Sequence, residues 1–157
     1  MKYMREKNCI ILAVSAATSD IATSQSIQMA KEVDPNRKRT VAVRTKLDLV
    51  DEGTEEEVRK TLAGEILPFK KGIVGVINRS QKDINNNSTI QDSIEKERMF
   101  FEEHYPELLD THRTPNLLSK LQRILIEHIQ ACIPGLEVRN SHFKVLAFRT
   151  IFYLYLV

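Results

Sequence analysis

Three short apolar runs, separated by segments with helix-forming patterns, constrain this sequence more than any other feature. The runs are residues 9–14 (CIILAV), residues 41–43 (VAV) and residues 72–77 (GIVGVI). A strand that is apolar throughout is typical of a parallel sheet covered on both faces, because neither direction of its side chains then meets water. Strands that alternate with helices predict the α/β class. We therefore expect a parallel sheet of about three strands with helices on both faces.

Helix signals fill the intervals between the apolar runs. Residues 24–33 carry apolar side chains at helical spacing, and the Asp-Pro step that follows ends this segment, because a residue before proline avoids the α region. Thr54 and Glu57 predict a capping box at the start of a second helix, and Ser88 and Gln91 predict another. Helices are therefore expected at residues 24–33, from Thr54, from Ser88 to about His104, and from Thr114 to about Cys132.

Size and composition narrow the class of protein. The chain has 157 residues, enough for one domain with a sizeable core. Its 23 basic and 21 acidic side chains nearly balance, which argues against a nucleic-acid partner. Cys9 and Cys132 have no metal-ligand spacing, which favours reduced thiols inside the cell. Residues 9–14 are also fewer than the roughly seven apolar residues of a secretory signal. We therefore expect a cytoplasmic protein.

Polar loops follow the second and third apolar runs. Residues 45–48 (TKLD) come directly after the second run, and residues 78–81 (NRSQ) come directly after the third. Ligands of open parallel sheets bind at the carboxyl ends of the strands. Because both loops leave the same edge of the sheet, we expect them to form one binding site.

Asp48 and Lys46 have the chemistry of a guanine-reading pair. A carboxylate accepts two parallel N–H bonds, and guanine offers these donors at N1 and at its 2-amino group, whereas adenine does not. A wrong base would leave the carboxylate desolvated and unpaired, so this pairing discriminates strongly. Lys46 can lay its methylene stem along the base. Taken alone, the tetrapeptide is better explained as a solvated turn, but its place directly after an apolar strand reverses that preference.

Several stretches of the chain resemble the dynamin superfamily of large GTPases. The loop VINRSQKDI resembles the base-backing loop of that family, and RTVAVRTKLDLVDEGT, NCIILAVSAATSDIATS and FFEEHYPEL resemble the sequence around it. LLSKLQRILIEHIQACIPGL resembles the helix that closes the G domain. The resemblance covers residues 8–136 and implies a partial P-loop GTPase fold, the C-terminal half of a dynamin-type G domain. Endocytic dynamins, organelle-division members and the antiviral Mx branch all remain open.

The resemblance assigns roles to residues of both loops. Asp48 would read the guanine edge, with Lys46 packed on the ring, and Asp51 would lie near the nucleoside and the family's dimer-facing edge. Thr45 would tie the two loops together by side-chain hydrogen bonding. Asn78, Arg79 and Gln81 would lie on the opposite side of the base and ribose, although Arg79 and Gln81 are also explained as solvated loop residues. The implied GTP-binding residues are Thr45, Lys46, Asp48, Asp51, Asn78, Arg79, Ser80 and Gln81.

The sequence lacks the phosphate-binding motifs of that family. No glycine begins a G-x-x-x-x-G-K-[S/T] loop, and there is no D-x-x-G element. The resemblance thus implies that the phosphate-loop and switch strands are missing, and that Mg²⁺, expected for the family, has no ligands in this chain. We expect no catalytic residue, no metal ligand and no GTP hydrolysis, because phosphoryl transfer depends on those parts. Affinity for GTP should be weak as well, since base contacts alone must offset the immobilisation of the ligand.

Three further expectations concern the rest of the chain. Residues 9–14 would form an unpaired apolar edge, so the chain would be poorly soluble or would need a complementing segment. Arg44 stands where the family has an apolar or small polar residue, and we expect it to face solvent from the strand end. Residues 137–157 form an atypical apolar tail, and its eleven-residue stretch from Ala147, interrupted by Arg149 and Thr150, is too short to span a bilayer. An alternative chain terminus explains this tail better than a membrane device.

Together these features predict a GTP-binding protein of the dynamin family, in which GTP hydrolysis is coupled to membrane remodelling, here reduced to guanine recognition. One alternative is a non-catalytic fragment that pairs with a full-length dynamin or Mx-like relative. Another is an unrelated doubly wound domain for a different nucleotide. The resemblance also implies homotypic contacts between G domains, association with membranes or microtubules, and peripheral membrane association of an otherwise cytoplasmic protein.

Overall fold

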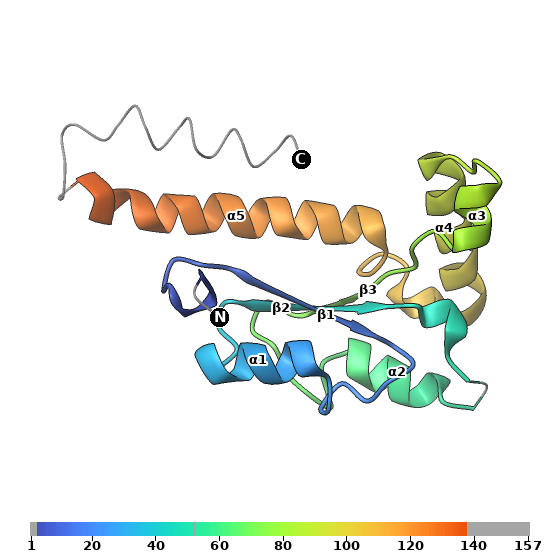
Figure 1. Ribbon diagram of the computed structural model, residues 1–157, viewed down its shortest axis with the longest axis horizontal. Coiled ribbons are helices and arrows are strands. Elements are labelled where there is room, and N and C mark those ends of the chain that lie inside the picture. The colour runs from blue at the N-terminus through green and yellow to red at the C-terminus, as the bar shows by residue number, and fades with distance from the viewer. Residues whose placement is uncertain (1–2, 52, 138–157) are drawn as a thin grey trace. The chain divides into compact units, whose positions relative to one another are not determined.

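The computed structural model describes residues 3–51 and 53–137 (Figure 1). The strands are β1 (Ile11–Ala16), β2 (Thr40–Thr45) and β3 (Ile73–Gly75). The helices are α1 (Gln25–Val33), α2 (Glu55–Leu62), α3 (Gln81–Asn85), α4 (Ile90–His104) and α5 (Thr114–Glu137). Short 3-10 turns lie at Tyr3–Arg5, Leu47–Leu49 and Pro106–Leu108.

The three strands form one parallel sheet in the order β1-β2-β3, with β2 in the centre. β1 pairs with β2 over its whole length, from Ile11 opposite Thr40 to Ala16 opposite Thr45. β3 pairs with β2 over a shorter stretch. The predicted α/β class and three-stranded parallel sheet are therefore confirmed.

One face of the sheet packs against α1 and α2 (Figure 1). Ile11, Ala13 and Ile73 point to this face and form a buried cluster with Ile27 of α1 and Leu62 of α2. The alternation of side chains along each strand follows from the pleat, which sends successive residues to opposite faces. This face holds the larger part of the hydrophobic core among the described residues.

The opposite face holds a smaller buried cluster. Val43 of β2 and Val74 and Val76 of the β3 segment are buried there, and Leu117 from the first turns of α5 packs on them. Helices therefore contact both faces of the sheet, as predicted.

β1 differs from the strand predicted at residues 9–14, both in position and in burial. It begins and ends two residues later, and Leu12 and Val14 are 46% and 47% exposed. The prediction that both faces of this strand are buried is therefore wrong. The amides of Ile11 and Ala17 bond to the β2 side, so the backbone groups of Leu12 and Val14 point to the outer side. Within the described part of the chain, β2 is the one strand that pairs with β1, so β1 is an edge strand.

The capping box predicted at the start of α2 is wrong. Thr54 precedes the helix, but its side chain caps no backbone amide of the helix. Its backbone angles, φ −104° and ψ 5°, lie outside the extended region that an N-cap residue normally adopts. The hydroxyl instead donates to the carbonyl of Asp51 at 2.7 Å.

Capping boxes do begin α3 and α4. At α4 the pair is Thr89 and Asp92, one residue after the pair predicted from Ser88. At α3 the pair is Ser80 and Asp83, in a segment where no helix was expected. Both boxes use an aspartate at the third helical position, whereas the prediction looked for Glu or Gln there.

The chain divides into two compact units, Met1–Leu121 and Gln122–Val157, and the sheet lies wholly within the first. The described part of the second unit is the remainder of α5, as far as Glu137. The predicted domain bounds of 8–136 and 137–157 stay a prediction, and residues 138–157 lie outside the described residues. No helix within residues 3–51 and 53–137 combines the length and apolar character needed to cross a bilayer.

The exposed apolar side chains of β1 generate a prediction about self-association. A Leu12→Lys, Val14→Lys double variant should still unfold cooperatively, with a free energy of unfolding within about 1 kcal/mol of the wild-type value, because these side chains are half exposed. It should stay monomeric at protein concentrations at which the wild type associates, because charges protect a sheet edge. Size-exclusion chromatography with light scattering measures this.

The buried neighbour Ala13 supplies the control. Ala13→Lys should abolish cooperative melting, because it places a charge in the core. A double variant that associates as strongly as the wild type would exclude this face of β1 as the cause.

Candidate functional site

The strand register brings the two predicted loops together at the carboxyl end of the sheet. Arg44, near the end of β2, lies opposite Gly75, the last residue of β3. Beyond that pair, the N–H of Val76 donates to the carbonyl of Arg44 at 2.8 Å. The loops that follow β2 and β3 therefore leave the sheet as neighbours. This is the edge at which ligands of open parallel sheets bind.

Leu47 anchors the first loop and turns its neighbours outward. Its side chain is buried against β3, where a Cβ added at Gly75 would lie 2.7 Å from Leu47 Cδ1. Glycine at position 75 therefore permits the close approach. Lys46 adopts left-handed backbone angles, φ 60° and ψ 40°, and precedes the 3-10 turn Leu47–Leu49. On either side of the buried leucine, Lys46 and Asp48 are exposed.

Three predicted site residues have uncommitted side chains, meaning side chains with no hydrogen bond or ion pair to another described residue. Lys46 and Asp48 in the first loop and Asn78 in the second are exposed. No hydrogen bond or ion pair joins their side chains to any other described residue. Exposed polar groups without internal partners, placed at neighbouring strand ends, are available to a ligand.

The other residues of the second loop have structural partners. Arg79 donates to the carbonyl of Ser88 at 3.2 Å, and Gln81 donates to the side chain of Asn85 at 3.0 Å. Ser80 forms the capping box of α3. These contacts give the loop a defined backbone, and they explain these side chains without a ligand.

Thr45 is held by β1 rather than by either loop. Its hydroxyl donates to the carbonyl of Ser15 at 3.5 Å, a long contact across the β1–β2 pair. The tie between the two loops that was predicted for Thr45 is therefore not seen among the described residues.

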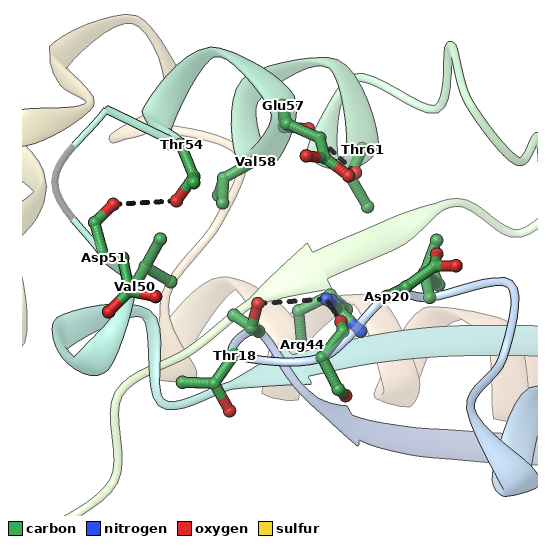
Figure 2. Close-up of a pocket in the computed structure, with 12 residues that line it drawn as sticks. Thr18, Asp20, Arg44, Val50, Asp51, Thr54, Glu57, Val58 and Thr61 are labelled. Atoms are coloured by element: carbon green, nitrogen blue, oxygen red, sulfur yellow. Dashed lines mark hydrogen bonds between the residues drawn. The ribbon is translucent and has the colours of Figure 1, made fainter.

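Asp51 lines a pocket of about 260 Å³ beside the end of the sheet (Figure 2). The pocket lies between the loop after β1, the loop after β2, and α2. Its wall combines hydroxyl groups, carboxylates and one guanidinium group, that of Arg44. The lining residues are Ala17, Thr18, Ser19, Asp20, Ile21, Arg44, Val50, Asp51, Thr54, Glu57, Val58 and Thr61.

Arg44 is buried, so the expectation that it faces solvent is wrong. Its side chain is 5% exposed and donates to Ser15 Oγ at 3.0 Å and to the carbonyls of Ala17 and Ser19 at 3.2 and 2.5 Å. Burial lowers the pKa of its guanidinium, and nearby carboxylates, foremost Asp20, oppose that shift. Arg44 lies on the face of β2 that packs against α2, and it fixes the loop after β1.

The outer edge of β3 is closed without another strand. The N–H of Gly75 donates to His112 Nδ1 at 2.9 Å, and the carbonyl of Gly75 accepts from the N–H of Arg113 at 2.9 Å. One step further along, the N–H of Ile77 donates to Glu97 Oε1 at 2.8 Å. Two side chains and one loop therefore supply the hydrogen bonds that a fourth strand would otherwise make.

Sequence reasoning missed Glu97 and His112. Glu97 lies on α4 in line with Ile94 and Phe101, at a spacing that predicts one helix face, so an acid on an apolar stripe was a readable signal. His112 gave no such signal. It is 4% exposed and stacks on Phe101, with ring centres 6.4 Å apart. Burial, with a smaller contribution from Lys120, lowers its pKa to about 4.

Comparisons with known proteins bear on the whole chain. A family model described as "Dynamin central region" matches residues 57–143, and one described as "Dynamin family" matches residues 1–47. A relative named "Dynamin-1-like protein" from Danio rerio is 47% identical over 139 residues, which cover 88% of this chain and 20% of the relative. "Dynamin-1" from Homo sapiens is 46% identical over 139 residues, which cover 87% of this chain and 16% of the relative. The chain therefore spans a fifth or less of the length of these relatives.

The buried imidazole of His112 predicts a pH dependence of stability. Its pKa of about 4 in the folded chain lies below the ordinary value of 6.5, so the unfolded chain binds more protons between these values. The free energy of unfolding should therefore fall by about 3 kcal/mol from this group as the pH drops from 7 to 4. Urea unfolding at several pH values measures the loss.

His112→Asn keeps an acceptor for Gly75 but does not titrate, so its stability should depend less on pH over this range. His104→Asn, at an exposed position of α4, controls for the same replacement made outside the core. Identical pH profiles for the wild type and His112→Asn would contradict the assignment.

Proposed function

Because this chain belongs to the dynamin family, we propose that the loops after β2 and β3 form the guanine-recognition half of a GTP-binding site. The observation that carries the proposal is the set of uncommitted polar side chains at two neighbouring strand ends. These are Lys46, Asp48 and Asn78. Internal contacts hold the backbone around them, so the loops are organised before a ligand arrives, which lowers the entropic cost of binding.

In this proposal, Asp48 supplies the specificity. Its carboxylate accepts from N1–H and from the 2-amino group of guanine, a pair of donors that adenine lacks. Lys46 packs its stem on one face of the base, and its left-handed backbone turns the side chain away from the sheet. Asn78 approaches from the second loop.

The remaining predicted residues shape the site. Ser80 and Gln81 secure the start of α3, and Arg79 secures the loop through Ser88. Thr45 holds the end of β2 to β1. Asp51, with its side chain exposed beside the pocket, is proposed to approach the nucleoside.

We further propose that these 157 residues do not hydrolyse GTP on their own. Phosphoryl transfer relies on a phosphate loop, a metal ion and a positioned water, and the sequence contains no phosphate-loop motif. Nor does the sequence supply the phosphate-loop Ser or Thr hydroxyl that would hold the Mg²⁺ bound to GTP phosphates.

The activities of the longer relatives enter only as proposals. Hydrolysis of GTP coupled to membrane remodelling, contacts between G domains, membrane or microtubule association, and a cytoplasmic location with peripheral membrane binding are proposed for a protein that includes this chain. Assignment to an organelle-division, endocytic or Mx-like branch is likewise left to that level. These proposals rest on family membership. They stay proposals because the chain covers only a fifth of the length of a relative such as the one from Danio rerio.

A second candidate function is that of an interaction fragment, which pairs with a longer dynamin or Mx-like relative. The open edge of β1 favours it, because exposed backbone groups beside Leu12 and Val14 can accept a further strand. Co-purification with a tagged full-length relative tests this function, and a wild-type level of capture by the Leu12→Lys, Val14→Lys variant would argue against that edge.

Base specificity provides the decisive test of guanine recognition. Calorimetric titration of the chain should detect GDP but not ADP. Asp48→Asn should weaken GDP by about 2 kcal/mol, because the amide presents one donor to guanine where the carboxylate presents two acceptors. The same variant should gain affinity for xanthosine diphosphate, whose C2 carbonyl accepts from that donor.

Glu56→Gln, at an exposed position of α2, is the matched control and should leave the affinities for GDP and xanthosine diphosphate unchanged. Equal binding of GDP and ADP by the wild type, or no response of either nucleotide to Asp48→Asn, would refute the proposal. GTP turnover above that of a Lys46→Ala, Asp48→Ala variant would refute the claim that the chain is inactive alone.

A further inference from the structure

We propose that Glu97 is a positioning residue for the second loop, residues 78–81. This inference rests on the proposed guanine site, because it concerns how one side of that site is held. It assigns to a buried carboxylate of α4 the task of fixing where the loop leaves β3. The argument begins with the surroundings of the carboxylate.

Glu97 is 1% exposed, and its carboxylate accepts hydrogen bonds from neutral donors. Oε1 accepts from the N–H of Ile77 at 2.8 Å and from the hydroxyl of Thr114 at 3.1 Å. Oε2 accepts from the N–H of Thr114 at 2.9 Å. A buried acid is tolerated when hydrogen bonds satisfy its oxygens, and here all three donors come from outside α4. The residue therefore joins three segments of the fold.

Ile77 is the residue directly before the loop, and its amide points away from β2. The amide of Val76 still bonds to the β2 side, through the carbonyl of Arg44. Successive amides of a strand point in opposite directions, so Ile77 needs a partner on the outer side. Glu97 is that partner. Past Ile77 comes Asn78, whose side chain is uncommitted, so Glu97 is the last fixed contact before a proposed ligand group.

The same helix also holds the far end of the loop. Lys96, next to Glu97 on α4, forms an ion pair with Asp83, the capping residue of α3. The Lys96 side chain in that pair is 59% exposed, and ion pairs at the protein surface contribute little. The buried contact at Ile77 therefore carries most of the positioning, and α4 acts as the support for the whole loop.

Thr114 gives the carboxylate its orientation. The first residue of α5 donates both its N–H and its hydroxyl to Glu97, which fixes both oxygens at once. Replacement of Glu97 by Gln would present an NH₂ group to at least one of these donors. The loss would be local, because the rest of β3 keeps its bonds to β2 and to His112.

The test compares the wild-type chain with Glu97→Gln and with Glu102→Gln, the same chemical change at an exposed position of α4. All are measured well below their melting temperatures. GDP affinity is followed by NMR titration, and amide hydrogen exchange is followed residue by residue. For Glu97→Gln, we expect GDP binding weaker by on the order of tenfold and faster exchange, by a similar factor, confined to residues 77–81 and to the amide of Thr114, which shares the acceptor. Glu102→Gln should match the wild type in both.

The outcomes separate the two proposals. If the wild type fails to bind GDP, the proposed function is wrong, and the exchange data alone decide the role of Glu97. If GDP binds but Glu97→Gln changes neither affinity nor local exchange, the positioning role is wrong. Faster exchange spread evenly over β1 and α1 would also overturn it, because that is general destabilisation.

Thr114→Val provides a milder variant in case Glu97→Gln does not fold. It removes only the hydroxyl donor to Oε1. The same local pattern at residues 77–81 should then appear with a smaller amplitude, by roughly threefold. Unchanged exchange at these residues in Thr114→Val, beside a Glu97→Gln that does not fold, would count against the proposal.

Discussion

Hydrogen bonds from two side chains and one backbone amide satisfy the outer side of the β3 segment. The strand has three residues, and the outer backbone groups of its last residue, Gly75, bond to His112 and Arg113. Two residues further on, the N–H of Ile77 bonds to Glu97. Each of these partners comes from the chain after β3, so the second loop acquires its position only when α4 and the start of α5 have packed. A buried imidazole and a buried carboxylate therefore supply hydrogen-bond acceptors where a neighbouring strand would otherwise do so. The position of the proposed site at the strand ends depends on both.

The two edges of the sheet differ in how their backbone groups are satisfied. The β3 edge is closed by groups from the same chain, whereas β1 has a neighbouring strand on one side only within the described residues. Leu12 and Val14 lie on that open side of the fold. Arg44, near the end of β2, ties the loop after β1 to the sheet and keeps the carboxyl end of the open strand ordered. Among the described residues, this edge of β1 is therefore well formed but lacks a second neighbouring strand.

The sequence predicted the sheet and its loops because apolar runs report directly on strands and topology follows from their alternation with helices. It failed where burial depends on distant partners. An apolar residue such as Val14 is recognised from sequence, but whether anything covers it is not. Arg44 looked like a surface charge, since its acceptors lie in a loop about 25 residues earlier. His112 likewise became buried only through its contacts with β3 and α4.

The left-handed backbone at Lys46 sets stability against recognition. A residue with a side chain is strained there by on the order of 1 kcal/mol, and glycine would relieve that strain. Stability of the fold alone would thus favour glycine at this position, but glycine would remove the aliphatic stem that we propose packs on a bound base. In the proposed site, the lysine side chain at this position therefore lowers the stability of the fold and contributes to ligand binding.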